Sequence, residues 1–142
     1  MKTISKLLWL TIGGGLLVWA DQATKGLIWS IEPSGWWTHH QNYGISFGIE
    51  LPYYLSVGLM AVFLIFLLWV LFQRGTCHPL MVMGLALSIA GGLSNLIDRI
   101  NLGFVRDFVA LSPWLPIFNL ADILVAGGVI LMLWSIYRYG RS

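Results

Sequence analysis

Hydrophobic residues along the chain gather into four long segments that short polar stretches separate. The segments span residues 7–28, 53–72, 80–97 and 117–137. Each approaches or exceeds the length of about 20 residues that a helix needs to cross the hydrocarbon core of a bilayer. The pattern predicts an α-helical polytopic membrane protein with four transmembrane helices, folded as a single domain over residues 1–142.

The first segment reaches membrane-spanning length only if it includes polar residues. Residues 7–20 alone are too short, so the helix is expected to continue through Asp21 and Lys25. Their i, i+4 spacing, with the acid first, predicts an ion pair on one helical face. A cleaved signal peptide is the alternative, because basic residues precede the apolar centre and residues 18–20 could form a cleavage site. Cleavage there would leave three spans.

The longest polar stretch, residues 29–52, follows the first segment. Within it, residues 42–48 combine asparagine, glycine and alternating apolar residues, which is typical of turns and short strands. We expect this stretch to lie at the membrane face. Residues 73–79 form a tight connector, and the third segment is rich in small residues, which let helix backbones approach closely in lipid.

Composition supports the membrane class and excludes others. Hydrophobic residues make up 58% of the chain and charged residues only 10%, a balance that does not fit a soluble domain. The net charge of +2 is too small to indicate a nucleic-acid partner. The single cysteine, Cys77, excludes an intramolecular disulfide.

The charges between the segments predict an orientation in the membrane. One side carries five basic residues and no acid: Lys2, Lys6, Arg74, Arg138 and Arg141. The other side carries all six acids with the remaining three basic residues. Since basic residues concentrate in cytoplasmic loops, both termini are expected to be cytoplasmic and every carboxylate to lie in the outer half of the membrane or beyond.

Two of the acids, Asp107 and Asp122, flank a short connector between the third and fourth segments. Carboxylates at a membrane boundary are costly and usually functional, and two brought together can share a proton and activate water. Pro113 and Pro116 stiffen the connector and help to fold residue 107 back toward residue 122. At about 1.5 Å per residue, Asp122 is expected on the order of 7–8 Å below the outer end of its helix.

Each of these carboxylates also has a structural interpretation. Asn119 and Asp122 have the spacing of a capping box at a helix start. Asp107 could belong to a surface ion pair or a local turn, although adjacent Arg106 is a poor partner because neighbouring residues rarely face each other. One cap does not need two buried acids, which favours the pair as a catalytic unit.

Three further polar residues, Asn95, Asp98 and Arg99, have the i, i+3, i+4 spacing of one helical face. The pattern predicts a structural cluster that could brace the carboxylates or hold a substrate backbone. His39 and His40 are adjacent and would point apart on a strand. No HExxH motif or spaced Cys/His set occurs, so no metal site is predicted.

Five sequence blocks, taken in order, make the chain similar to one family. The blocks are Asp-Gln-Ala-Thr-Lys (21–25), Asn-Tyr-Gly-Ile-Ser-Phe (42–47), Gly-Gly-Leu-Ser-Asn-Leu-Ile-Asp-Arg (91–99), Val-Arg-Asp-Phe (105–108) and Phe-Asn-Leu-Ala-Asp (118–122). On these blocks the chain resembles the lipoprotein signal peptidases, the bacterial signal peptidase II family. Any one block alone is weak, but five in register across nearly the whole chain are specific.

The resemblance implies four membrane helices, a small periplasmic β-rich cradle and a short amphipathic segment, in the bacterial inner membrane. The implied reaction is that of an aspartic endopeptidase, which removes the signal peptide of diacylglyceryl-modified prolipoproteins by cutting just before the lipidated cysteine. It requires neither a metal nor an organic cofactor. Membrane lipids as partners, inhibition by a globomycin-type peptide and a monomeric state are further implications.

The resemblance also assigns roles to residues. The implied catalytic pair is Asp107 and Asp122. The residues expected to bind substrate or brace the site are Asn42, Gly44, Asn95, Arg99 and Asn119. Structural support is expected from Asp21, Lys25 and Asp98. The chain departs from the family at two positions, with Arg106 where an apolar residue is common and Ile123 where a small hydroxyl residue is frequent.

Other classes of protein make different demands on the sequence. A transporter or channel could use Asp21, Asp98 and Asp122 as a proton path, but all the acids lie at one side and leave no relay across the inner half. A noncatalytic scaffold would explain the spans but not the two acids. A serine–lysine protease would need a neutral Lys25, which the neighbouring Asp21 opposes.

Overall fold

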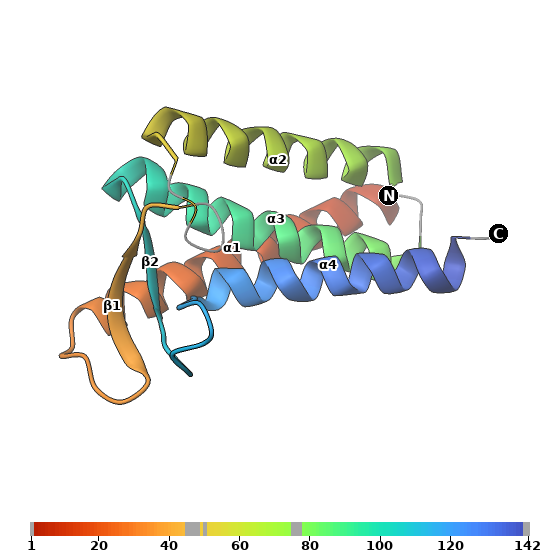
Figure 1. Ribbon diagram of the computed structural model, residues 1–142. Helices are drawn as coiled ribbons and strands as arrows, with labels where there is room; N and C mark the ends of the chain where they lie inside the picture. Colours follow the sequence, from red (N-terminus) through yellow and green to blue (C-terminus); the bar gives the residue numbers. More distant parts are fainter. Residues whose placement is uncertain (1, 45–48, 50, 75–77, 141–142) are drawn as a thin grey trace.

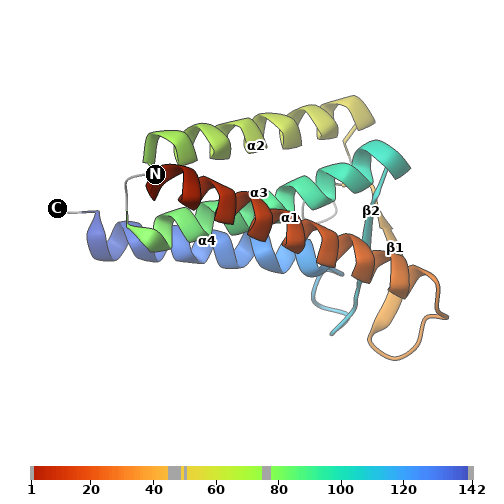
Figure 2. The ribbon, with the colours of Figure 1, turned by 180° about the vertical axis from the view of Figure 1, so that it is seen from behind.

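The computed structural model describes residues 2–44, 49, 51–74 and 78–140, and in that part of the chain four long helices accompany one small sheet. The helices are α1 (Lys2–Trp29), α2 (Tyr53–Arg74), α3 (Pro79–Leu102) and α4 (Leu120–Tyr139), and the strands are β1 (Trp37–Asn42) and β2 (Val105–Val109). Figure 1 shows the helices side by side with the sheet across one end of the bundle. The first turn of α1 and the last turn of α4 lie at the opposite end of the bundle, as the view from behind in Figure 2 also shows.

Three helices, α2, α3 and α4, are long and apolar enough to cross a membrane, with mean hydropathies of 2.8, 1.8 and 2.0. Within the described residues α1 is not among them, and it carries the polar side chains of Asp21, Gln22 and Lys25. The multi-pass helical class is therefore confirmed, while the crossing of the membrane by α1 stays a prediction.

α3 is the central helix, since α1, α2 and α4 all pack against it. It begins at Pro79, whose missing N–H costs nothing in a first helical turn, and the Nδ1 atom of His78 accepts the Leu80 N–H at 3.3 Å. It ends at Gly103, which adopts the left-handed conformation (φ 83°) that favours glycine at a helix end. The helix thus runs five residues beyond the predicted end at residue 97.

Glycines allow α3 and α4 to touch backbone to backbone. A methyl group added at Gly84 would lie 2.6 Å from the Gly128 carbonyl oxygen, and one added at Gly91 would overlap the Ala121 carbonyl oxygen. Small residues permit such close approach in lipid, where helices associate by packing. We call this contact the glycine seam; it fixes the start of α4 against the C-terminal half of α3.

α4 begins at residue 120, three residues later than predicted. Residue 118 is used differently: the Phe118 N–H donates to the Val109 carbonyl at 3.2 Å, and Val109 returns a hydrogen bond at 2.9 Å. This bridge to β2 holds the chain extended until Asn119. Asp122 therefore lies in the first helical turn, and the prediction that it lies 7–8 Å inside the helix is wrong.

The two strands pair in antiparallel fashion, with His40 opposite Asp107 and Asn42 opposite Val105. One face of β1 packs on the end of α1, where the His39 ring stacks on Trp29 with ring centroids 4.8 Å apart. The expected β-rich cradle is thus a two-stranded sheet. The expected amphipathic segment has no counterpart among the described helices. Parts of two predicted features, the turn-rich stretch (45–48) and the tight connector (75–77), lie outside the described residues, as does residue 50.

Candidate active site

The carboxylates of Asp107 and Asp122 are joined through one residue, Asn119. The Asn119 Nδ2 donates to Oδ1 of Asp107 at 2.6 Å, while the Asn119 backbone N–H donates to Oδ2 of Asp122 at 3.0 Å. Asp107 comes from β2 and Asp122 from the first turn of α4. The bridge at Val109 and Phe118 brings these two elements together, so both carboxylates face one point at the sheet end of the bundle.

Asp122 is also part of a capping box. The Asn119 Oδ1 accepts the Asp122 N–H at 3.0 Å, and the Asp122 carboxylate returns a bond to the Asn119 N–H. The structural interpretation of this spacing is therefore correct, but it uses only one carboxylate oxygen. The other, Oδ1, accepts the Asn95 Nδ2 at 2.8 Å.

Asp107 is almost completely buried, with 1% of its surface exposed. Its Oδ2 accepts the Asn42 Nδ2 at 2.8 Å, in addition to the bond from Asn119. Burial raises the pKa of Asp107 to about 7, and the nearby charge of Asp122 acts in the same direction against the two amide donors. At neutral pH both the protonated and the ionised form of this carboxyl group are therefore populated, as acid–base work requires.

A buried lysine lies behind the carboxylates. The Lys25 Nζ is 2.7 Å from Oδ2 of Asp21, so the predicted i, i+4 ion pair is present, and it donates to Oδ1 of Asn95 at 2.8 Å. Asp21 in turn accepts the Ala121 N–H at 2.8 Å. Through these contacts α1 orients Asn95, which holds Asp122, and also ties down the first turn of α4.

Arg106 forms the largest polar contact that sequence reasoning missed. It turns away from Asp107 and grips Asp98, with Nη2 2.8 Å from Oδ1 and both its backbone N–H and its Nε donating to Oδ2. Nη2 also donates to Oε1 of Gln22 at 2.8 Å. The signal was the departure at this position, because a largely buried cation needs an acidic partner. Asp98 also lies 3.4 Å from Lys25, so it connects α1, α3 and β2.

Arg99 does not pair with Asp98, although the two are adjacent on α3. Its Nη1 and Nη2 donate to the carbonyl oxygens of Tyr43 and Gly44 at 2.6 and 2.5 Å. Its Nε is buried and has no hydrogen-bond acceptor among the described residues. Gly44 packs tightly here, because a methyl group on it would lie 2.7 Å from the Ile49 carbonyl oxygen.

The structure thus brings every candidate residue into one cluster at the sheet end of the bundle. Asn42, Asn95 and Asn119 contact the carboxylates, and Asp21, Lys25 and Asp98 form the layer behind them. Gln22 and Ser94, to which the sequence analysis assigned no role, join that layer through a hydrogen bond of 2.9 Å. Among the described residues no three His, Cys, Asp or Glu side chains gather as metal ligands would.

Comparisons with known proteins agree on one family. The family described as signal peptidase (SPase) II matches residues 14–138. A lipoprotein signal peptidase of Moorella thermoacetica is 37% identical over 100 residues, which are 70% of this chain and 66% of that protein. Another from Pelotomaculum thermopropionicum is 33% identical over 91% of this chain and 90% of its own length.

A solved structure shares the fold as well. A bacterial membrane enzyme solved by the in meso method superimposes with a TM-score of 0.80 at 26% identity, covering 94% of this chain and 91% of its own. The family match includes α3, both strands and the start of α4. The chain belongs to the signal peptidase II family.

Proposed function

We propose that this signal peptidase II removes the signal peptides of lipoproteins as an aspartic endopeptidase, with Asp107 and Asp122 as its catalytic pair. The observation that carries the proposal is the shared Asn119, which binds both carboxylates. Two acids held together share one proton, because both cannot ionise cheaply at short range. Such a pair supplies an acid and a base at once.

In the proposed mechanism one carboxylate takes a proton from a water molecule, whose oxygen attacks the scissile carbonyl. The other, protonated, donates a hydrogen bond to the carbonyl oxygen and stabilises the negative charge that develops there. Collapse of the tetrahedral intermediate then transfers a proton to the leaving amine. The raised pKa of Asp107 supports a shared proton at neutral pH.

The surrounding amides have a positioning role in this proposal. Asn42 and Asn119 fix the two oxygens of Asp107, and Asn95 fixes Asp122. Arg99 faces the site with a buried Nε–H that has no acceptor among the described residues. We assign this donor to a backbone carbonyl of the bound substrate, since a buried N–H without a partner is costly in the free enzyme.

The substrate is proposed to be a prolipoprotein whose cysteine carries diacylglycerol, cut just before that cysteine. Two acyl chains hold the scissile bond near the headgroup region, and the carboxylates lie at the start of α4, the level at which that bond would arrive. A precursor without acyl chains lacks this positioning. We therefore expect purified enzyme to shorten the lipidated precursor on a gel and to leave the same precursor without its lipid intact.

The matched pair of substrates decides the outcome, because the peptide sequence is the same in both. Equal cleavage of the two would mean that the acyl chains do not position the bond. Cleavage of neither by the folded enzyme would contradict the proposed reaction. A globomycin-type peptide is expected to block cleavage of the lipidated form, and the enzyme is expected to act as a monomer.

For the membrane, we propose that α1 is a fourth span, that both termini are cytoplasmic and that the site lies near the outer face, within one domain. The sequence carries five basic residues and no acid on the proposed cytoplasmic side. Reporter fusions after Arg74 and at the C-terminus are expected to be cytoplasmic, and fusions near Thr38 and Ser112 periplasmic. A periplasmic C-terminus would contradict four spans.

A further inference from the structure

The free end of the sheet, farthest from α2, exposes large apolar side chains. They come from the turn before β1 and from the connector after β2. A hydrogen bond joins these two segments, since the Ala110 N–H donates to the Trp36 carbonyl at 2.9 Å. Trp36 is 68% exposed and Trp114 is 92% exposed, and Leu111 and Leu115 are each more than half exposed. We call Trp36, Leu111, Trp114 and Leu115 the sheet tip.

The composition of the sheet tip does not fit a loop that faces water. Residues 108–118 and 33–38 contain no charged residue, although water-facing connectors are usually polar. Adjoining apolar side chains that stay exposed usually mark a contact surface. Two tryptophans within such a patch favour a membrane–water interface, because the indole combines a large apolar ring with one N–H donor.

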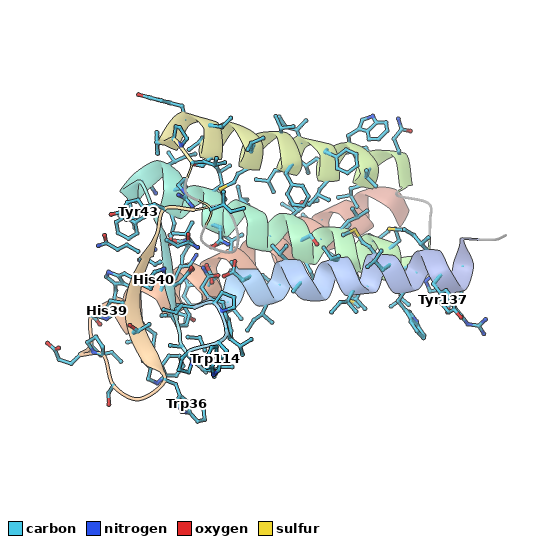
Figure 3. The ribbon with its side chains drawn as sticks, in the orientation of Figure 1. Trp36, His39, His40, Tyr43, Trp114 and Tyr137 are labelled. Carbon is cyan, nitrogen blue, oxygen red and sulfur yellow. The ribbon has the colours of Figure 1, made fainter. Side chains whose placement is uncertain are left out.

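The position of the sheet tip agrees with that chemistry. In Figures 1 and 2 the strands run across the helix axes and leave the bundle sideways at the level where α4 begins. Figure 3 shows Trp36 and Trp114 outside the helical bundle, toward the end of the sheet farthest from α2. Since α4 can cross the membrane, a group that projects sideways from its end meets lipid headgroups.

We propose that the sheet tip inserts into the interfacial layer of the lipid leaflet at the site end of the bundle. The partner is the lipid surface itself, which Trp36 and Trp114 contact beside α4. This inference goes beyond the proposed cleavage reaction, because it concerns how the sheet is held and would stand for any reaction at the site.

Insertion of the sheet tip would fix how deep in the membrane the two strands lie, and with them the part of the carboxylate site that the strands supply. The sheet tip is continuous with the strands that carry Asn42 and Asp107, and a groove of about 870 Å³ runs between Trp36, Trp114 and Asn42. The sheet is attached to the bundle through His39, which contacts the end of α1, and through Arg106, which binds Asp98 on α3. Insertion of the tip would attach the far end of the sheet to the membrane as well, so that end could not move away from the lipid.

The direct test places a spin label at Trp114→Cys in a Cys77→Ser background, in nanodiscs of phosphatidylcholine. The matched control is Gln41→Cys, an exposed position on the same sheet. The label at 114 is expected to collide often with dissolved oxygen and rarely with a water-soluble nickel chelate, and the label at 41 to show the reverse. Equal access of the chelate to both would overturn the proposal. Protection of 114 from both reagents would also overturn it, since that indicates cover by protein.

The functional test compares Trp36→Ser/Trp114→Ser with Trp36→Phe/Trp114→Phe, using lipidated precursor in vesicles. The serine double variant is expected to raise KM about threefold to tenfold with kcat unchanged, because interfacial anchors contribute modest energies. The phenylalanine variant should lie near the wild type. An unchanged KM in the serine variant would contradict the proposal that the sheet tip sets the depth of the strands. Such a variant would still cleave the precursor, so the proposed cleavage reaction would stand.

Discussion

Asp107→Asn and Asp122→Asn are each expected to reduce turnover by about 10²–10⁴-fold or more, the typical range for loss of an acid–base group. Each substitution keeps the size of the side chain but removes its ionisable oxygen. If the two carboxylates act as one unit, the double variant should lose little more than either single variant. The measurement is turnover on lipidated precursor in detergent, normalised to folded protein. Retention of more than about a tenth of wild-type turnover by both single variants would exclude the aspartic mechanism.

The normalisation matters because both changes also disturb hydrogen bonds. Both oxygens of Asp107 accept amide donors, so an amide nitrogen at that position would face another donor. Asp98→Asn is the matched control: it weakens the buried contact with Arg106 and Lys25 but leaves both proposed catalytic groups in place. It is expected to lower thermal stability and yield while turnover per folded molecule changes much less.

The same pair predicts a pH profile for turnover. An acid is protonated below its pKa, and burial raises the pKa of Asp107 to about 7, so the protonated partner is lost as the pH rises above about 7. At low pH both groups become protonated, and the base that activates water is lost. Turnover is therefore expected to fall on both sides, with apparent values that belong to the pair. A profile that stays flat from about pH 5 to about pH 9 would contradict a shared proton.

Gly91→Ala is expected to reduce turnover by about 10²-fold, although residue 91 touches neither carboxylate. The added methyl group would overlap the Ala121 carbonyl oxygen, and it would also lie 2.9 Å from Cγ2 of Val125. Backbone cannot swing aside as a side chain can, so α3 and α4 must separate. That movement draws Asp122 away from Asn95, and a misplacement of about 1 Å can cost 10²-fold in rate. Overpacking should also lower stability by about 1–3 kcal/mol.

Gly92→Ala provides the neighbouring control on the same helix. Its methyl group would meet the Leu64 side chain at 3.0 Å, and a leucine side chain can adjust by a few tenths of an ångström. Turnover of this variant should stay within about threefold of the wild type, because the Leu64 side chain can move without shifting the helix backbones. Equal turnover in the two variants would show that the glycine seam does not position the site.

The helices and the polar positions on them could be predicted because their signals are local. A run of apolar residues defines a span, and the i, i+4 spacing of Asp21 and Lys25 is enough to predict their ion pair. The capping box at Asn119 is likewise contained in four residues. Only the resemblance to a family predicted that these residues gather at one site. They come from distant parts of the chain: the hydrogen bond from the Ala121 N–H to Asp21, for example, joins residues 100 positions apart.

The features that sequence reasoning missed depend on how separate elements pack against one another. β2 exists because β1 pairs with it, and without that partner residues 105–109 looked like a connector. Residue 117 looked like the start of a helix because Ile117 and Phe118 are apolar, but the backbone of Phe118 is bound to Val109. The partner of Arg106 is Asp98, eight residues earlier on α3. The two side chains meet because the turn at Gly103 places β2 alongside that helix.

The glycine seam also separates the site from changes in bilayer thickness. The hydrogen bonds of the carboxylate site join α1, α3, α4 and the two strands, while α2 packs on α3 alone among the described elements. Membranes of different thickness make helices tilt to match the hydrocarbon layer. In this fold α3 and α4 are joined at the glycine seam and tilt as one unit, so the distance between the carboxylates need not change with the lipid.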